Sequence, residues 1–168
     1  NVWEEAGETA KFEKDDMCTI VTKLWKEDGT VWSPSFRPTE EKLDEWLDYE
    51  NVIGVGEIGL DYHHKYGNKN DQIEFFLKQL DMAEKHELPV IVHSRKAMQD
   101  TYDILKKHNV VGSMHSYQGS VEMAKEFIKL GFYIGIGGTV TFKNARKVKE
   151  VAQYVPLERI VLETDAPY

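Results

Sequence analysis

From Asn51 onward, short apolar runs containing β-branched residues alternate with longer segments in which apolar residues recur at helical spacing. This alternation is typical of consecutive βα units, in which neighbouring strands run parallel and helices cover the sheet. It constrains the fold more than any other feature, because parallel strands need a long crossover connection, usually a helix. We expect five strands, at 51–57, 89–93, 110–115, 132–136 and 159–165.

The segments between these strands have the pattern of amphipathic helices. In 71–86 one apolar stripe is formed by Ile73, Phe76, Leu77, Leu80 and Ala83. We expect Asn70 to cap this helix and Ser120 to cap a helix over 121–130. Other helices are expected over 97–108 and 143–154, and an earlier one follows Thr39. Two further runs, 17–25 and 30–36, could each form a strand.

The composition fits one soluble globular domain over 1–168, in which 1–38 is the divergent part. The chain has 168 residues, of which 41% are hydrophobic and 30% charged. Its single cysteine, Cys18, excludes an intramolecular disulfide and is expected to be a small buried residue. No membrane span or secretion signal is visible, so we expect a cytoplasmic protein, or a nuclear one in a eukaryotic cell. Nothing indicates an oligomeric state.

The net charge of −8 comes from the first fifty residues, because acidic and basic residues balance from Asn51 to Tyr168. This distribution argues against broad electrostatic binding to nucleic acid, which needs clustered lysine and arginine. It leaves a nucleic-acid substrate open, because a bound divalent ion can supply positive charge locally. The basic run at 141–149 could track a nucleic-acid backbone, or it could be the solvated face of an amphipathic helix.

Four of the five expected strands end in a residue that can bind a metal: Glu57, His93, His115 and Asp165. In parallel α/β folds the carboxyl ends of the strands share one face, where ligands bind. Two imidazoles and two carboxylates suit Zn, Mn, Fe or Co better than soft metals. The alternative is that the carboxylates cap helices and the histidines pack in the rim of the sheet.

At these residues the sequence resembles the TatD family of metal-dependent hydrolases. The motifs GEIGLDY (56–62), VIVHSR (90–95), MHSYQGS (114–120) and LETDAPY (162–168) occur in that family's order and approximate spacing, and the resemblance covers roughly 39–168. It implies an α/β fold, a TIM-type (β/α) barrel of the amidohydrolase kind. It also implies a centre with up to two divalent ions (Mg, Mn or Zn) and deoxyribonuclease activity, commonly 3′-to-5′ exonucleolytic, with DNA as substrate.

The resemblance assigns roles to individual residues. Glu57 matches the family's bridging carboxylate, His93 and His115 match the imidazoles of one metal position, and Asp165 matches the aspartate beside the second metal and its water. We expect Asp165 to orient or deprotonate that water, with Glu57 as the other catalytic carboxylate.

Residues near these ligands could contact substrate. Arg95 could hold a phosphate, or form a surface salt bridge instead. Tyr62 and His63 could line the pocket, solvent exposure being the alternative for His63. Asp61 could support a metal ligand through a hydrogen bond.

One part of the family pattern is missing. The family begins with a His-x-His pair on its first strand, whereas every histidine here lies between His63 and His115. We expect the position formed by Glu57, His93 and His115 to survive, and the one shared with Asp165 to lack its histidines. We also expect an incomplete barrel, because such barrels take about 250 residues. A truncated or wrongly assembled gene product, omitted segments and a degenerate family member are the open explanations.

Three functions are therefore compared. The first is a divalent-metal-dependent phosphodiester hydrolase, a deoxyribonuclease impaired by the missing ligands. The second keeps the barrel and metal but acts on another ester or amide. The third is a noncatalytic family member that acts as a binding protein.

Overall fold

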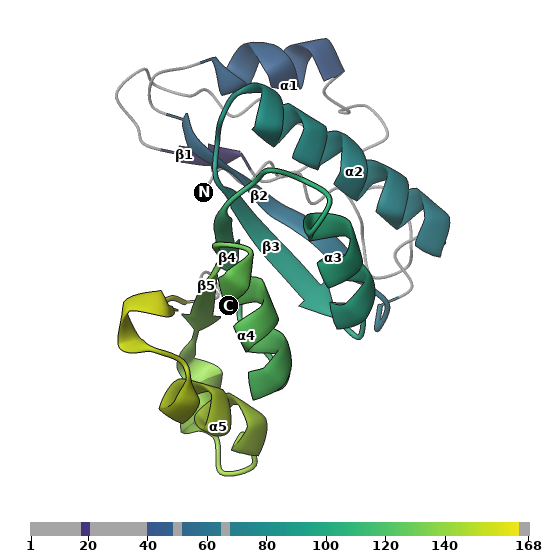
Figure 1. The fold of residues 1–168 in the computed structure, drawn as a ribbon. Helices are drawn as coiled ribbons and strands as arrows, with labels where there is room; N and C mark the ends of the chain where they lie inside the picture. The colour runs from purple at the N-terminus through teal and green to yellow at the C-terminus, as the bar shows by residue number, and fades with distance from the viewer. Residues whose placement is uncertain (1–17, 21–39, 49–51, 65–67, 165–168) are drawn as a thin grey trace.

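The computed structural model describes residues 18–20, 40–48, 52–64 and 68–164, and it contains one parallel sheet (Figure 1). Six strands follow one another across the sheet in chain order, each hydrogen-bonded in parallel to the next. They are β1 (Cys18–Ile20), β2 (Val52–Asp61), β3 (Val90–Arg95), β4 (Gly112–Met114), β5 (Tyr133–Ile136) and β6 (Ile160–Leu162). The expected parallel α/β architecture is therefore present.

Helices connect these strands, as the alternating pattern predicts. They are α1 (Glu40–Leu47), α2 (Lys69–Lys85), α3 (Met98–Leu105), α4 (Val121–Lys129) and α5 (Arg146–Tyr154), with short 3-10 turns η1 (Gly138–Thr141) and η2 (Leu157–Arg159). Figure 1 shows α2, α3 and α4 along the same side of the sheet. Within the described residues, none of the helices has both the length and the apolar character needed to cross a membrane.

The core lies where these helices meet the sheet. Phe76, Leu80 and Ala83 of α2 are fully buried, as is Phe127 of α4. The ring of Phe127 makes edge contacts with three other aromatic rings, those of Tyr102, Tyr117 and Phe132. The predicted stripe on α2 is thus correct at these three positions, whereas Leu77 is 36% exposed.

Two glycines allow neighbouring strands to approach. A Cβ at Gly112 would overlap the carbonyl oxygen of Val90 on β3. Gly59 of β2 has a φ of 133° and lies opposite His93, whose carbonyl oxygen a Cβ would also overlap. Both positions therefore require a residue without a side chain.

Several expected boundaries are shifted. The second strand does not end at Glu57 but continues to Asp61. Helix α2 is capped by Asn68 and not by Asn70, because the Asn68 side chain accepts the N–H of Asp71. Ser120 caps α4 as predicted, accepting the N–H of Met123. The helix expected over 143–154 begins only at Arg146.

Of the two uncertain runs near the start, 17–25 contains β1, and 30–36 lies outside the described residues. Among the described strands β1 and β6 form the two edges, so the sheet is an open arc and not a closed barrel.

Candidate metal centre

A bulge in β2 positions Glu57. Gly56 pairs with Ile91 and Ile58 pairs with Val92, so Glu57 is the extra residue between two consecutive positions of β3. Bulges of this kind redirect a side chain and are common beside active sites. The Glu57 side chain is only 19% exposed, and its Oε1 lies 2.8 Å from Nδ1 of His93.

His93 lies between two carboxylates of β2. Its Nδ1 faces Glu57, and its Nε2 lies 3.1 Å from Oδ2 of Asp61. A carboxylate on one ring nitrogen fixes the orientation of an imidazole and raises its basicity, which is the usual support for a metal-binding histidine. The contact between Asp61 and His93 is of the kind predicted for a residue that supports a metal ligand through a hydrogen bond.

Asp61 is itself held from several directions. Its Oδ1 accepts the backbone N–H groups of His63 and His64, and its Oδ2 lies 2.9 Å from Nδ1 of His64. Burial acts to raise the pKa of Asp61, but hydrogen bonds from His93, His64 and the loop backbone outweigh it and hold the pKa well below its usual value. The buried side chain of Gln72 binds both the N–H and the carbonyl of Asp61. Asp61 is therefore a rigid carboxylate.

The next loop residues face different ways. The Tyr62 hydroxyl donates to Asp100 of α3 at 2.9 Å, and burial together with this contact raises the pKa of Tyr62. His63 is exposed, and the charges of Lys96 and Arg95 lower its pKa. Arg95 is exposed at the end of β3. The predicted roles of Tyr62, His63 and Arg95 in substrate binding stay predictions.

His115 lies directly after β4, the strand that pairs with the His93 strand β3. Its N–H donates to the carbonyl of Val92 at 2.8 Å, so residues 93 and 115 occupy equivalent positions on adjacent strands. Its Nδ1 lies 3.0 Å from Oε2 of Glu163, and the other oxygen of Glu163 accepts the N–H of Ser116. Each predicted histidine is therefore paired with a carboxylate at the carboxyl edge of the sheet.

Glu163 is a site residue that the sequence interpretation missed. It is the first residue after β6, and its N–H donates to the carbonyl of Ile136 on β5. The available signal was the acidic residue two positions before Asp165 in the LETD motif. Asp165 itself lies outside the described residues, so its proposed contact with the metal stays a prediction.

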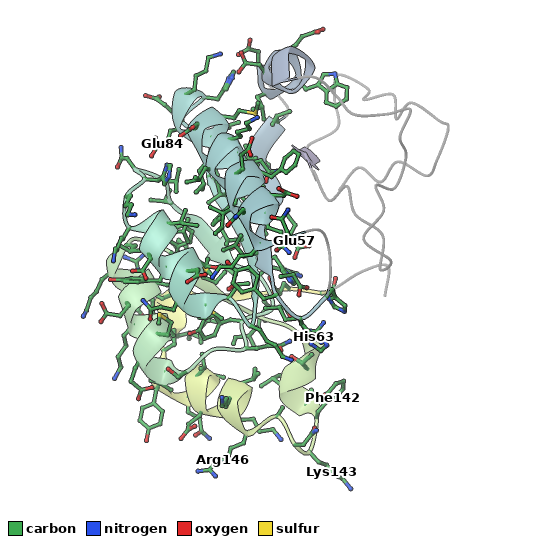
Figure 2. All side chains as sticks on the ribbon, turned by 90° about the vertical axis from the view of Figure 1, so that its right-hand side faces the viewer. Glu57, His63, Glu84, Phe142, Lys143 and Arg146 are labelled. Atoms are coloured by element: carbon green, nitrogen blue, oxygen red, sulfur yellow. The ribbon has the colours of Figure 1, made fainter. Side chains whose placement is uncertain are left out.

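The described residues also contain a second group of possible ligands, formed by Asp81, Glu84 and His108. Their ligand atoms all lie within 4.8 Å of one another. No other group of three possible ligands among the described residues meets this distance. This second group lies in the last part of α2 and just after α3. Figure 2 shows Glu84 at the opposite end of the molecule from His63.

The donors at the carboxyl edge suit a divalent ion. Imidazoles and carboxylates, without thiolates, are the ligands that Zn, Mn, Fe and Co accept and that Mg accepts in part. Glu57 and His93 could hold such an ion from β2 and β3. His115 lies on the adjacent strand, but the ligand atoms of Glu57, His93 and His115 do not all lie within 4.8 Å of one another. The contacts of Asp61 and Glu163 with these histidines supply the outer support that metal sites need.

Known proteins are similar to this chain in sequence and in fold. The family model described as TatD related DNase matches residues 26–168, and so includes part of the 1–38 segment expected to be divergent. The uncharacterized metal-dependent hydrolase YabD of Bacillus subtilis is 42% identical over 146 residues, covering 82% of this chain and 57% of that protein. YcfH of Escherichia coli, described in the same words, is 41% identical and covers 71% of this chain and 46% of its own.

Solved structures give the same result. The TatD homologue YjjV of Escherichia coli superimposes with a TM-score of 0.72 at 36% identity, covering 77% of this chain and 51% of its own. A TatD-family hydrolase of Entamoeba histolytica gives a TM-score of 0.66 at 28% identity. An amidohydrolase of Saccharomyces cerevisiae gives 0.65 at 26% identity. The expected TIM-type fold of the amidohydrolase kind is confirmed, as an open part of the barrel.

The chain spans about half the length of the curated relatives it matches. The family match nevertheless covers most of its residues, including every motif on which the resemblance rests. The chain therefore belongs to the family of TatD-related DNases.

Proposed function

We propose that this chain carries the active site of a divalent-metal-dependent phosphodiester hydrolase that removes nucleotides from the 3′ end of DNA. The observation that supports the proposal best is the His93 imidazole held between Glu57 and Asp61, with the His115–Glu163 pair on the adjacent strand. The names of the family and of its relatives supply the reaction class.

Each residue has a distinct task in this proposal. Glu57, His93, His115 and Asp165 would hold the metal, which would lower the pKa of a water molecule and stabilise negative charge at the phosphate. Asp61 keeps one nitrogen of His93 engaged, so that the other is directed at Glu57. Asp165 orients the attacking water and receives its proton. Arg95, exposed at the end of β3, binds a phosphate oxygen with its forked guanidinium.

The activity of these 168 residues by themselves is expected to be weak. No histidine precedes His63, so the family's first-strand pair has no counterpart in this sequence. A single well-held ion cannot provide the clamp on both attacking and leaving oxygens that two ions provide. Activity equal to that of a full-length relative would contradict this expectation.

Metal content tests the proposal first. The chain should retain Mn²⁺ or Zn²⁺ after dialysis, and His93→Ala or Glu57→Gln should remove most of it. His108→Ala is the matched control, because this histidine belongs to the second group of possible ligands at the other end of the molecule. Retention below about a tenth of an equivalent, or loss in His108→Ala alone, would refute the assignment of the metal to the carboxyl edge.

The second measurement identifies the substrate. Metal-loaded chain is incubated with 3′-labelled single-stranded DNA and, separately, with simple carboxyl esters. We expect slow release of the 3′ nucleotide that stops in His93→Ala. Turnover of the esters with intact DNA would instead indicate a hydrolase of another class. Metal binding with no turnover of either would indicate a binding protein.

A further inference from the structure

We propose that the loop after β5 and the first turn of α5 together form a stacking and phosphate-binding surface that guides single-stranded DNA to the metal centre. This surface consists of Phe142, Lys143, Arg146 and Lys147 and is called the loop surface below. The choice of DNA as its ligand rests on the proposed function. Its existence rests on the position, the exposure and the charge of these four residues.

The loop begins beside the candidate centre. Strand β5 ends at Ile136, whose carbonyl accepts the N–H of Glu163, the residue that pairs with His115. A Cβ at Gly137 would lie 3.7 Å from the carbonyl oxygen of Glu163. Turn η1 follows at once and leads into Phe142. The loop that carries Phe142 therefore starts at the carboxyl edge of the sheet.

Phe142 projects from a rigid piece of backbone. Its ring is 58% exposed, although a phenylalanine gains free energy from burial. Its N–H donates to Thr139, and its carbonyl accepts both the N–H of Ala145 at 3.2 Å and Nζ of Lys149 at 2.6 Å. Figure 2 shows the ring pointing outward at the same end of the molecule as His63. An aromatic ring held in this way offers a face to a nucleobase with little loss of conformational freedom.

Among the residues that the structure describes, the cations of the loop surface have no carboxylate partners, unlike several helix lysines. Lys85 pairs with Asp44, Lys106 with Asp103 and Lys129 with Glu126. By contrast, in the described part of the chain no carboxylate pairs with the exposed cations of the loop surface, Lys143, Arg146 and Lys147. The same is true, within the described residues, of Arg95 and Lys96, the two exposed cations that follow His93.

This grouping favours a strand of nucleic acid over other ligands. Cations without carboxylate partners can neutralise phosphates without first breaking an ion pair. The Phe142 ring, which directly precedes Lys143 in the chain, adds stacking, which every base can use and which a simple polyanion cannot. The sequence pattern left a solvated helix face as the alternative for 141–149. The position of Phe142 and the absence of carboxylate partners for the neighbouring described cations argue for binding.

Binding without metal separates this surface from catalysis. A fluorescent oligothymidylate of about 12 nucleotides is titrated with the chain in EDTA, and anisotropy is followed between about 50 and 200 mM salt. The test variants are Lys143→Gln/Arg146→Gln and Phe142→Ala. The matched controls are Lys107→Gln/Lys125→Gln, which removes two exposed cations without carboxylate partners among the described residues, and Leu157→Ala, which removes an 82% exposed apolar side chain.

The two test variants should fail in different ways. Loss of two phosphate contacts should lower the slope of log affinity against log salt by about 1.4. Phe142→Ala should weaken binding by roughly 5- to 150-fold and leave that slope unchanged. Both controls should bind like the original chain. All variants should unfold at nearly the same temperature, because the altered side chains are exposed. If Lys143→Gln/Arg146→Gln proves unstable, the single variant Arg146→Gln replaces it.

Equal affinity of Phe142→Ala and the original chain would overturn the proposal, because the surface would then be a general polyanion site. Equal losses in the test and control charge variants would overturn it too. DNA binding with these signatures but no metal-dependent cleavage would refute the proposed function and leave the loop surface standing. Metal-dependent cleavage of DNA, with cleavage and DNA affinity unchanged in every loop variant, would refute the loop surface and leave the proposed function standing.

Discussion

Removing the Asp61 carboxylate should loosen the loop after β2 and destabilise the protein. Asp61 is 7% exposed, and its two oxygens accept two backbone N–H groups and contact two imidazoles at 2.8 to 3.1 Å. Asp61→Ala loses all four contacts. Asp61→Asn keeps an oxygen for the backbone N–H groups of His63 and His64 and loses mainly the charge. The difference between the two variants therefore isolates the backbone contacts.

The magnitude follows from the kind of bond. Hydrogen bonds to a charged group contribute about 1.5 to 3 kcal/mol each. The two backbone bonds fall at the low end of this range, because His63 is exposed and water can replace its partner. We expect Asp61→Asn to lower the free energy of unfolding by about 1 kcal/mol, and Asp61→Ala, which also loses the two backbone bonds at about 1.5 kcal/mol each, by about 4 kcal/mol. For a chain of this size these losses correspond to roughly 2–4 °C and 8–16 °C in Tm.

Urea unfolding followed by circular dichroism measures both losses, and thermal unfolding checks them. Fits of the urea curves should share one m-value, so that the midpoint alone reports stability. Equal effects of alanine and asparagine would refute the assignment of the stabilisation to the backbone N–H groups. A loss of less than about 0.5 kcal/mol in Asp61→Ala would show that this loop is not held by the carboxylate.

Three further substitutions test the fold. Gly112→Ala should prevent normal pairing of β4 with β3, because its Cβ would overlap the Val90 carbonyl; a large fall in Tm is expected, and an unchanged Tm would contradict the strand register. Phe127→Ala should lower the free energy of unfolding by about 3 to 5 kcal/mol in urea titrations, because the ring is fully buried. Asp100→Asn should change the pH dependence of Tm. The contact with Lys69 holds the pKa of Asp100 below its usual 3.8. The ionised Asp100 therefore stabilises the folded state above about pH 4, and this stabilisation is lost as the pH falls further. The difference in Tm between Asp100→Asn and the original chain should narrow below about pH 4 and stay constant above about pH 6.

The sequence by itself determined the order and type of most elements. Apolar periodicity and capping depend on neighbouring residues in the chain, so the βα alternation and the Ser120 cap could be read directly. The same local logic placed His93 and His115 at the ends of their strands. In the structure His93 lies within β3 and His115 directly follows β4, both at the carboxyl edge. The pattern predicted Asn70 as the cap of α2, whereas the structure uses Asn68.

Only the tertiary structure decided how these residues meet. The bulge at Glu57 comes from a shift in the register between β2 and β3, and this pairing joins residues more than thirty positions apart in the chain. The contact of Asp61 with His93 and that of Glu163 with His115 likewise join different strands. Such contacts leave no period in the chain, because the free energy that selects them comes from strand pairing and burial and not from local backbone preference.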